Sequence, residues 1–347
     1  MILKIYFLLT TVCLIVCIIG LLTGCVENTL ITSPPDTADV LFVSNQDTGT
    51  QRKELYSLDI ESGIITRLTY SNIHFFIVGM DTSRRYVVAS CAEEDTDSPM
   101  GLGDEDRRSL WVFDLETNDG KRLTDPLNHA EGDSFSPDGE WIIFFMRLAG
   151  EEQSDIYKIK RDGSNITRLT CTLAAVEGDP CWSNDGKTIV FTYYDMNTSR
   201  FVIKQMDTDG NNIQLIYDGG EGVSTAVFPP GNYDPTLSPD DEWIVFERAV
   251  NYSEQNFGSG IWHIFKVTRN GSDMIDLSVL GQHADRAEYL PSFSPDGTSI
   301  IYGSFYESVD PNNSHVDLFM MDSINGRETR LTHTSKSNMS PIWIPKR

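Results

Sequence analysis

The sequence predicts an all-β fold, and three observations carry that prediction. A five-residue phrase with a tight-turn signal recurs four times, a short run of aromatic and β-branched residues follows each copy, and four segments end in Arg-Leu-Thr. Short apolar runs of this composition are typical of strands. The copies of the phrase are FSPDG at 135–139, WSNDG at 182–186, LSPDD at 237–241 and FSPDG at 293–297.

Each copy of the phrase marks a unit of four antiparallel strands. After the first copy, a strand is predicted at 141–146, and a second apolar run at 155–159 leads into the turn Asp162-Gly163. Asp-Gly and Asn-Gly pairs tolerate the positive φ angles of tight hairpins. The Arg-Leu-Thr segment at 168–170 closes the unit. The strand before the phrase and the three after it make four.

Repeats of about 40–55 residues with four strands each predict a β-propeller. Complete units begin near Ile73, Glu131, Glu177, Tyr233 and Glu288. In the first of them, residues 80–85 stand where the turn phrase is expected. Three strands within 40–69 lack an inner strand, and residues 340–345 supply one. We therefore expect a six-bladed β-propeller of four-stranded antiparallel blades, with the C-terminal strand closing blade 1 and removing an open sheet edge.

The FSPDG turns, the strands that end in Arg-Leu-Thr and the Asp-Gly hairpins resemble the TolB-like six-bladed β-propeller family with its WD-like Pro-Asp-Gly repeats. The resemblance covers about residues 38–347. It implies a binding or scaffold module, although similar repeats occur in prolyl oligopeptidase-like enzymes and in oligogalacturonate lyases. We expect no counterpart of the family's N-terminal α/β domain, because only about a dozen residues separate the leader from blade 1.

The N-terminal segment predicts export. Lys4 precedes an apolar stretch from Ile5 to Leu22, and Leu-Thr-Gly then leads to Cys25, which resembles a lipoprotein cleavage box. This interpretation gives a signal peptide at 1–24, a lipidated Cys25, a tether at 25–37 and the propeller at 38–347. The alternative is an uncleaved transmembrane anchor, because about 18 apolar residues can span a bilayer. Both place the propeller outside the cytoplasm, in the periplasm or at the cell surface.

The net charge and the absence of several catalytic motifs reduce the number of function classes that fit the sequence. The formal net charge of -24 argues against nucleic acid, because phosphate contacts need a basic surface. It favours cations, basic partners or solubility alone. The sequence contains no Gly-x-Ser-x-Gly nucleophile elbow, HExxH zinc motif or phosphate-binding glycine loop. We therefore expect a non-catalytic, monomeric module that binds a protein partner of an envelope complex or an extracellular ligand.

One face of the ring carries the long connections, and long loops on a rigid scaffold are where binding residues concentrate. We predict that this face is the interaction surface. The connections are 91–109, 147–154, 249–260 and 305–315 within blades, with 217–232 and 281–289 between blades.

Acidic residues near the start of the inner strands are predicted to ring the channel mouth on this face. Converging carboxylates could bind Ca²⁺ or attract a basic peptide. The alternative for Asp133, Asp179 and Asp234 is purely structural, namely hydrogen bonds to the backbone of neighbouring blades. The candidates are Glu131, Asp133, Glu177, Asp179, Asp234, Asp285 and Glu288.

Histidines fall in the connections of several blades. The resemblance to metal-dependent oligogalacturonate lyases implies that they could hold Mn²⁺, which would make the protein a carbohydrate-active enzyme. Solvent-exposed loop histidines are common, however, and the spacing is not a compact metal motif. Metal binding is therefore the alternative, and no cofactor is the main expectation. These residues are His74, His129, His283 and His333.

Three cysteines follow Cys25, and they cannot all pair within one chain. Cys171 ends one unit and Cys181 lies in the first strand of the next, so a disulfide across that connection is possible in an oxidising compartment. Cys91 would remain as the odd thiol.

Overall fold

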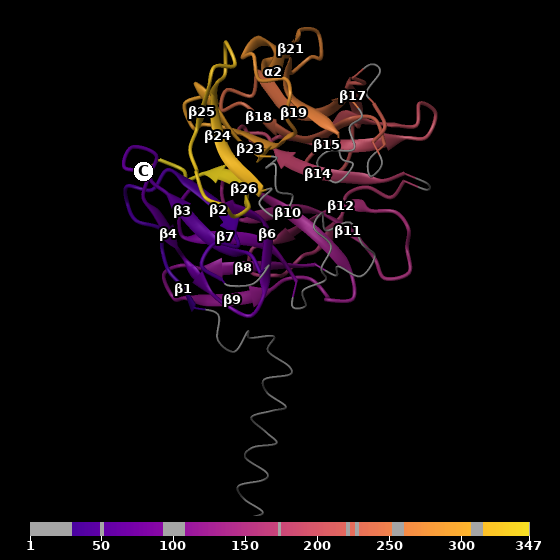
Figure 1. Cartoon of the computed structure of the whole chain (residues 1–347). Coiled ribbons are helices and arrows are strands. Elements are labelled where there is room, and N and C mark those ends of the chain that lie inside the picture. Colours follow the sequence, from indigo (N-terminus) through magenta and orange to yellow (C-terminus); the bar gives the residue numbers. More distant parts are fainter. Residues whose placement is uncertain are drawn as a thin grey trace, which may run out of the picture.

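The computed structural model describes residues 30–48, 52–92, 108–172, 175–219, 223–225, 229–251, 260–306 and 315–346, without the side chains of Asp133 and Tyr306. These residues form six four-stranded antiparallel sheets that stand around a common centre (Figure 1). This arrangement is a six-bladed β-propeller, and it confirms the predicted fold. Within the described ranges, no helix is long and apolar enough to cross a membrane.

In each blade, the strands are ordered from the centre of the ring to its outside. Blade 1 contains β26 (Asn338–Trp343), β2 (Val40–Ser44), β3 (Glu54–Leu58) and β4 (Ile65–Arg67). Blade 2 contains β6 (His74–Met80), β7 (Tyr86–Ala92), β8 (Ser109–Asp114) and β9 (Asp119–Arg122). Blade 3 contains β10 (His129–Phe135), β11 (Trp141–Arg147), β12 (Asp155–Lys160) and β13 (Thr167–Arg168).

Blade 4 contains β14 (Glu177–Trp182), β15 (Thr188–Asp195), β16 (Arg200–Asp207) and β17 (Gln214–Tyr217). Blade 5 contains β18 (Asn232–Leu237), β19 (Trp243–Asn251), β20 (Ile261–Thr268) and β21 (Met274–Asp276), and a one-turn helix α2 (Leu277–Leu280) follows it. Blade 6 contains β22 (Glu288–Phe293), β23 (Ser299–Tyr306), β24 (His315–Asp322) and β25 (Glu328–Arg330).

The two ends of the chain share blade 1, as predicted. Strand β26 pairs antiparallel with β2, so that Trp343 lies opposite Val40 and Asn338 lies opposite Ser44. The C-terminal strand therefore supplies the inner strand that the N-terminal part lacks, and the ring closes by main-chain hydrogen bonds between its first and last strands.

The recurring phrase folds as a turn that its own side chains stabilise. In its first copy, the Ser136 hydroxyl accepts the N–H of Trp141 at 2.9 Å and donates to Asp138 at 2.5 Å. Gly139 takes the left-handed φ of 69° that the turn requires. In blade 2, which lacks the phrase, Asp81 accepts the N–H of Tyr86 at 2.7 Å and serves the same purpose.

The threonine of each Arg-Leu-Thr segment has a repeated structural role. Its hydroxyl accepts a main-chain N–H from the third strand, as Thr170 does from Ile156 at 2.9 Å. Thr69, Thr124 and Thr332 make the same bond at the same distance. Blade 5 lacks the tripeptide, and there Ser278 of α2 accepts the N–H of Ile264 at 2.9 Å. These bonds satisfy a buried donor in blades 1, 2, 3, 5 and 6.

The core lies between neighbouring blades, where the inward-facing sides of adjacent sheets pack together. Phe144 and Ile142 of blade 3, for example, pack with Val88 and Leu110 of blade 2, and all four are fully buried. The segment predicted as a tether is described only from Leu30, and from there it lies on the ring. Its strand β1 (Leu30–Ile31) pairs with β5 (Thr69–Tyr70) at the outside of blade 1.

Candidate functional site

The inner strand of every blade carries a β-bulge at the same place in its register. Two residues of the inner strand oppose one residue of the second strand, as between Gly178 and Cys181 of β14. In four blades the first bulged residue has a left-handed φ of about 50° and a proline follows it. These residues are Asp179, Asp234, Leu290 and Ser340. A bulge re-aims a side chain, so this position differs from the ordinary alternation of a strand.

The bulges surround a cavity of about 70 Å³ at the centre of the ring. All six inner strands contribute to its wall, which makes it part of the central channel. Its volume accommodates a few water molecules or the charged end of a long side chain. One lining residue from each strand is Ile77, Glu131, Asp179, Asp234, Leu290 and Ser340.

On one side of this cavity, acidic groups are held by neutral donors. Asp179 accepts the hydroxyl of Thr192 at 3.0 Å and the N–H of Asp234 at 3.4 Å. Burial raises the pKa of Asp179 to about 6. Behind the wall, Glu247 of β19 is 5% exposed and accepts the N–H of Leu290. Burial and the charge of Asp179 raise the pKa of Glu247 to about 8.

In the adjoining blade 3, the carboxylate of Glu131 is paired with two basic groups. Arg108 lies 2.8 Å from its Oε1 atom, and the Nε2 atom of His129 lies 2.6 Å from the same oxygen. Burial alone would raise the pKa of Glu131, but the two partners outweigh it and lower the pKa to about 2. The wall of the cavity therefore places a carboxylate with basic partners, Glu131, next to a carboxyl group whose pKa is raised, Asp179.

The structure brings only some of the predicted mouth residues together. Glu131, Asp179 and Asp234 line the cavity, whereas Glu177 and Glu288 begin their inner strands and are buried between blades. Asp285 is 88% exposed, 3.9 Å from Arg286. The side chain of Asp133 is outside the described residues. The hydrogen bond from the Asp234 N–H to Asp179 agrees with the structural alternative and leaves the cavity-facing role open.

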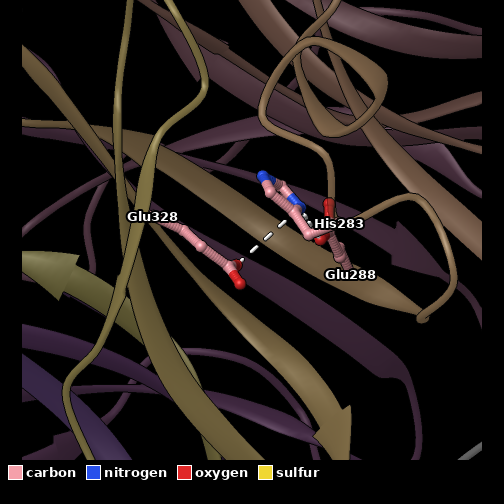
Figure 2. A group of neighbouring side chains, drawn as sticks. All are labelled: His283, Glu288 and Glu328. Atoms are coloured by element: carbon pink, nitrogen blue, oxygen red, sulfur yellow. Dashed lines mark hydrogen bonds and ion pairs between the residues drawn. The ribbon is translucent and has the colours of Figure 1, made fainter.

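The four histidines have separate surroundings. His74 is buried and stacks on Phe76, His129 contacts Glu131, and His333 is exposed. In the described ranges, one group of His, Cys, Asp and Glu side chains gathers its ligand atoms within 4.8 Å, and His283 is the only one of the four histidines in it. The group consists of His283, Glu288 and Glu328 (Figure 2).

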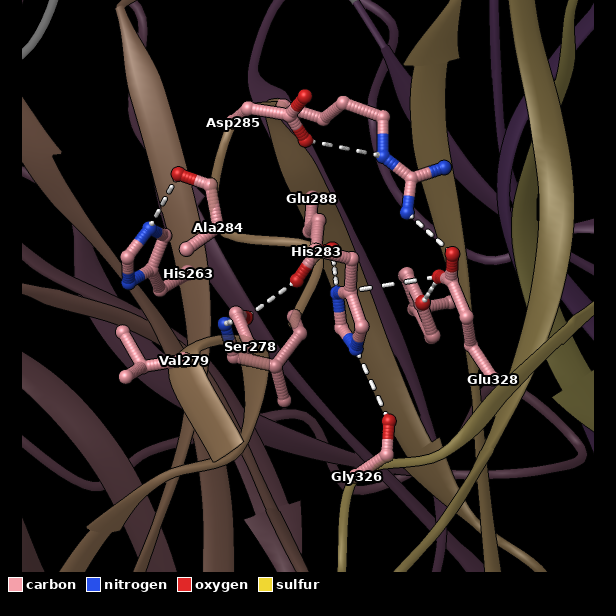
Figure 3. Close-up of polar contacts among 12 residues, drawn as sticks. His263, Ser278, Val279, His283, Ala284, Asp285, Glu288, Gly326 and Glu328 are labelled. Carbon is pink, nitrogen blue, oxygen red and sulfur yellow. Dashed lines mark hydrogen bonds and ion pairs between the residues drawn. The ribbon is translucent and has the colours of Figure 1, made fainter. Parts of the chain in front are cut away.

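His283 lies between two acceptors. Its Nδ1 atom is 2.6 Å from Glu288 and its Nε2 atom is 2.9 Å from the carbonyl oxygen of Gly326 (Figure 3). Because neither partner can donate, both ring nitrogens must carry protons. Burial opposes this charge, but the bonds to Glu288 and Gly326 outweigh burial and raise the pKa of His283. The geometry is that of an imidazolium with both nitrogens occupied.

Glu328 has its own partners. Arg286 and the hydroxyl of Tyr302 each donate to it at 2.6 Å. Two carboxylates thus face one imidazolium and one guanidinium, and the charges cancel within the protein. A metal ion would have to displace the proton on Nδ1 and add two positive charges next to Arg286. We therefore assign this cluster a structural role at the junction between blades 5 and 6.

Glu247 and Glu328 were missed by the sequence analysis. A signal existed for Glu247, because it interrupts the apolar run of β19. Glu328 lies on a short outer strand of ordinary polarity and gave none.

The remaining predicted sites stay predictions. Cys171 is exposed, Cys181 is half-buried with its Sγ atom 3.4 Å from the carbonyl oxygen of Trp182, and the structure draws both as thiols. Cys25 is outside the described residues, as is most of the long connections at 91–109, 249–260 and 305–315.

Comparisons with known proteins agree with the fold. Residues 98–257 match the PD40 family model, described as the TolB beta propeller domain. An uncharacterized protein of Agrobacterium fabrum is 29% identical over 149 residues, which is 40% of this chain and 46% of that protein. The Tol-Pal system protein TolB of Francisella tularensis subsp. holarctica (strain OSU18) is 25% identical over 243 residues, 69% of this chain and 50% of its own length. The chain spans about half the length of these curated relatives.

Solved structures show the same architecture. The crystal structure of TolB from Acinetobacter baumannii superposes with a TM-score of 0.64 at 18% identity, covering 94% of this chain and 69% of that one. An oligogalacturonate lyase from Vibrio parahaemolyticus superposes with a TM-score of 0.53 at 14% identity, covering 88% and 78%. At these identities the likeness concerns the fold alone. The repeats and the six closed blades show that the chain is a six-bladed β-propeller, and the family match shows its similarity to the TolB beta propeller domain.

Proposed function

We propose that this propeller is a non-catalytic binding module, anchored on the outer side of a membrane, that binds a basic segment of a protein partner at its central channel. The leader ending at Cys25 supports the anchor. Relatives named as Tol-Pal system proteins support a place in a multi-protein envelope assembly. The long connections on the same face supply further contacts to the partner.

The observation that carries this proposal is the acidic side of the cavity. Asp179 and Asp234 line it from adjoining blades, and hydroxyl and amide donors hold Asp179. A carboxyl group whose pKa is raised by burial regains its charge when a cation arrives, because the cation compensates the lost hydration. An ammonium or guanidinium group that enters the channel would therefore bind beside Asp179 and lower the pKa of its carboxyl group.

Calorimetry of the whole chain in detergent, titrated with a Lys-Gly decapeptide and with its Glu-Gly counterpart, tests this function. We expect binding of the basic peptide only, and Asp179→Asn/Asp234→Asn should weaken it about fivefold, or about 1 kcal/mol. The matched control is Glu116→Gln/Asp209→Asn, which removes the same formal charge from side chains that are 68% and 79% exposed. Equal losses in both double variants would reduce the effect to the overall charge and contradict a channel site.

Titration with Ca²⁺ and Mn²⁺ separates a protein ligand from an ion. A stoichiometric heat with Ca²⁺ that Asp179→Asn/Asp234→Asn abolishes, together with no heat from the basic peptide, would make the channel an ion site. The lyase-like alternative has less support. The described residues do not gather the four histidines at one point, and His129 and His283 are engaged with Glu131 and Glu288.

A further inference from the structure

The segment that leads from the leader into the propeller is fixed on the outside of blade 1. In the β1–β5 ladder, Leu30 lies opposite Tyr70 and Ile31 lies opposite Thr69. The N–H of Thr32 donates to the carbonyl oxygen of Leu68 at 2.9 Å and continues the ladder. Ile31 is fully buried in the core shared by blades 1 and 2. The chain is therefore held to the ring from Ile31 onward.

The other side of this ladder is apolar and open to solvent. Leu30 is 55% exposed and Tyr70 is 51% exposed, and their direct pairing puts both side chains on one face. The guanidinium of Arg67 lies 4.3 Å from the centre of the Tyr70 ring. Arg67 itself is ion-paired with Glu54, so the exposed surface consists of the aliphatic Leu30 and the aromatic Tyr70, and both residue types are favourable at a membrane–water interface. Figure 1 shows β1 at the edge of the ring, near β9.

The length of chain before this ladder identifies its occupant. From Cys25 to Leu30 there are five residue steps, which span at most about 18 Å. If the leader stays uncleaved, its apolar stretch ends at Leu22, and the span to Leu30 is at most about 29 Å. Under either anchor, the outside of blade 1 cannot move far from the bilayer surface.

We propose that the Leu30–Tyr70 edge of blade 1 rests on the lipid bilayer, so that the ring stands on this rim and leaves both ends of its central channel free of the membrane. The inference rests on the anchor in the proposed function. Two half-exposed side chains form a small contact, and the formal charge of -24 opposes approach to anionic lipids. The contact therefore depends on the high local concentration that the anchor provides.

Photocrosslinking in vesicles tests the orientation. The full chain is produced in a host that processes lipoproteins and is reconstituted into phosphatidylcholine vesicles, with p-benzoylphenylalanine replacing Tyr70. The matched control carries the same group in place of Leu215, which is 58% exposed on β17, the outer strand of blade 4 on the opposite side of the ring. Lipid adducts are measured by mass spectrometry of the protein after irradiation.

We expect at least about fivefold more lipid adduct at position 70 than at position 215, because only the first lies within reach of the anchor. Leu30→Asp should lower the yield at position 70 by about half or more, since a carboxylate avoids the interface. Equal yields from chains that float with the vesicles would overturn the rim contact and leave the anchor intact. Chains that do not float with the vesicles would overturn the anchor and this inference with it.

Discussion

The central channel and the junction between blades 5 and 6 both withdraw carboxyl groups from water, but they treat the charge differently. At the junction, Glu288 and Glu328 face the imidazolium of His283 and the guanidinium of Arg286. In the channel, hydroxyl and amide donors hold Asp179. The charges at the junction balance within the protein, whereas the proposed function assigns to a bound cation the charge that balances Asp179. Under that proposal, the same residue types have a structural role in one place and a binding role in the other.

The largest expected effect comes from breaking the junction. His283→Ala should leave Glu288, which is fully buried, without its cation and lower the free energy of unfolding by about 3 kcal/mol. Urea unfolding at pH 6 measures this loss. His333→Ala removes an exposed histidine and should change stability by less than about 0.5 kcal/mol. Similar small effects for both variants would show that the junction does not need the imidazolium.

The opposite sign is expected next to the channel. Glu247 has a pKa raised from 4.5 to about 8, so its proton is held more tightly in the folded state and stability falls as pH rises between these values. Glu247→Gln keeps the bond to the Leu290 N–H and should remove this fall, which makes the variant more stable than the parent at pH 8 by about 1–2 kcal/mol. Thermal unfolding between pH 4 and 9 tests it. A parallel pH dependence in parent and variant would contradict the buried-acid interpretation.

A second histidine sharpens the comparison. The ring of His263 also lies between two acceptors, Asp276 at 2.8 Å and the carbonyl oxygen of Ala284 at 3.1 Å. Burial opposes its charge, but these partners raise its pKa above 6.5. Its stabilising contribution is therefore complete below pH 6.5 and is lost as pH rises through the folded-state pKa.

His263→Gln should remove about 1 kcal/mol at pH 6 and less at pH 9. The contribution of His263 to stability begins to fall at a higher pH than that of Glu247. Comparing the double variant His263→Gln/Glu247→Gln with each single variant therefore separates the two contributions. A loss that is the same at pH 6 and pH 9 would assign His263 a packing role alone.

The smallest effect on stability is expected for an ion pair at the protein surface. Lys187 is 78% exposed and lies 3.1 Å from Asp185. Lys187→Ala should change the free energy of unfolding by less than about 0.5 kcal/mol, because water screens exposed pairs. Urea unfolding at low and high salt is the measurement. A loss as large as that of His283→Ala would mean that burial does not decide which charges stabilise this fold.

The sequence predicted the architecture because its repeats carry the hydrogen bonds that shape it. The serine and aspartate of the turn phrase and the threonine of Arg-Leu-Thr bind main-chain groups in the units that carry them, as Ser136, Asp138 and Thr170 do in blade 3. Asp179 and Asp234 could be selected because acidic residues recur near the start of the inner strands. The bulge that turns them toward the cavity could not be predicted from a sequence pattern.

The limits of prediction lie in contacts between blades. Glu328 reaches His283 from another blade's outer hairpin, and Glu247 reaches the backbone of Leu290 across a blade boundary. Such pairs depend on how far one sheet is rotated against the next. No spacing within a repeat encodes that rotation, so the sequence could not place Glu328 beside His283 or Glu247 beside Leu290.

The pairing of β26 with β2 also determines when the ring can close during folding. Blade 1 lacks its inner strand until residues 338–343 are available, so the ring cannot close while the end of the chain is still being synthesised or translocated. Late closure of the ring would benefit an exported protein of this fold, because a chain that has not yet folded can cross a membrane in an extended conformation. Closure of the ring by β26 is therefore the last step that the order of the chain allows.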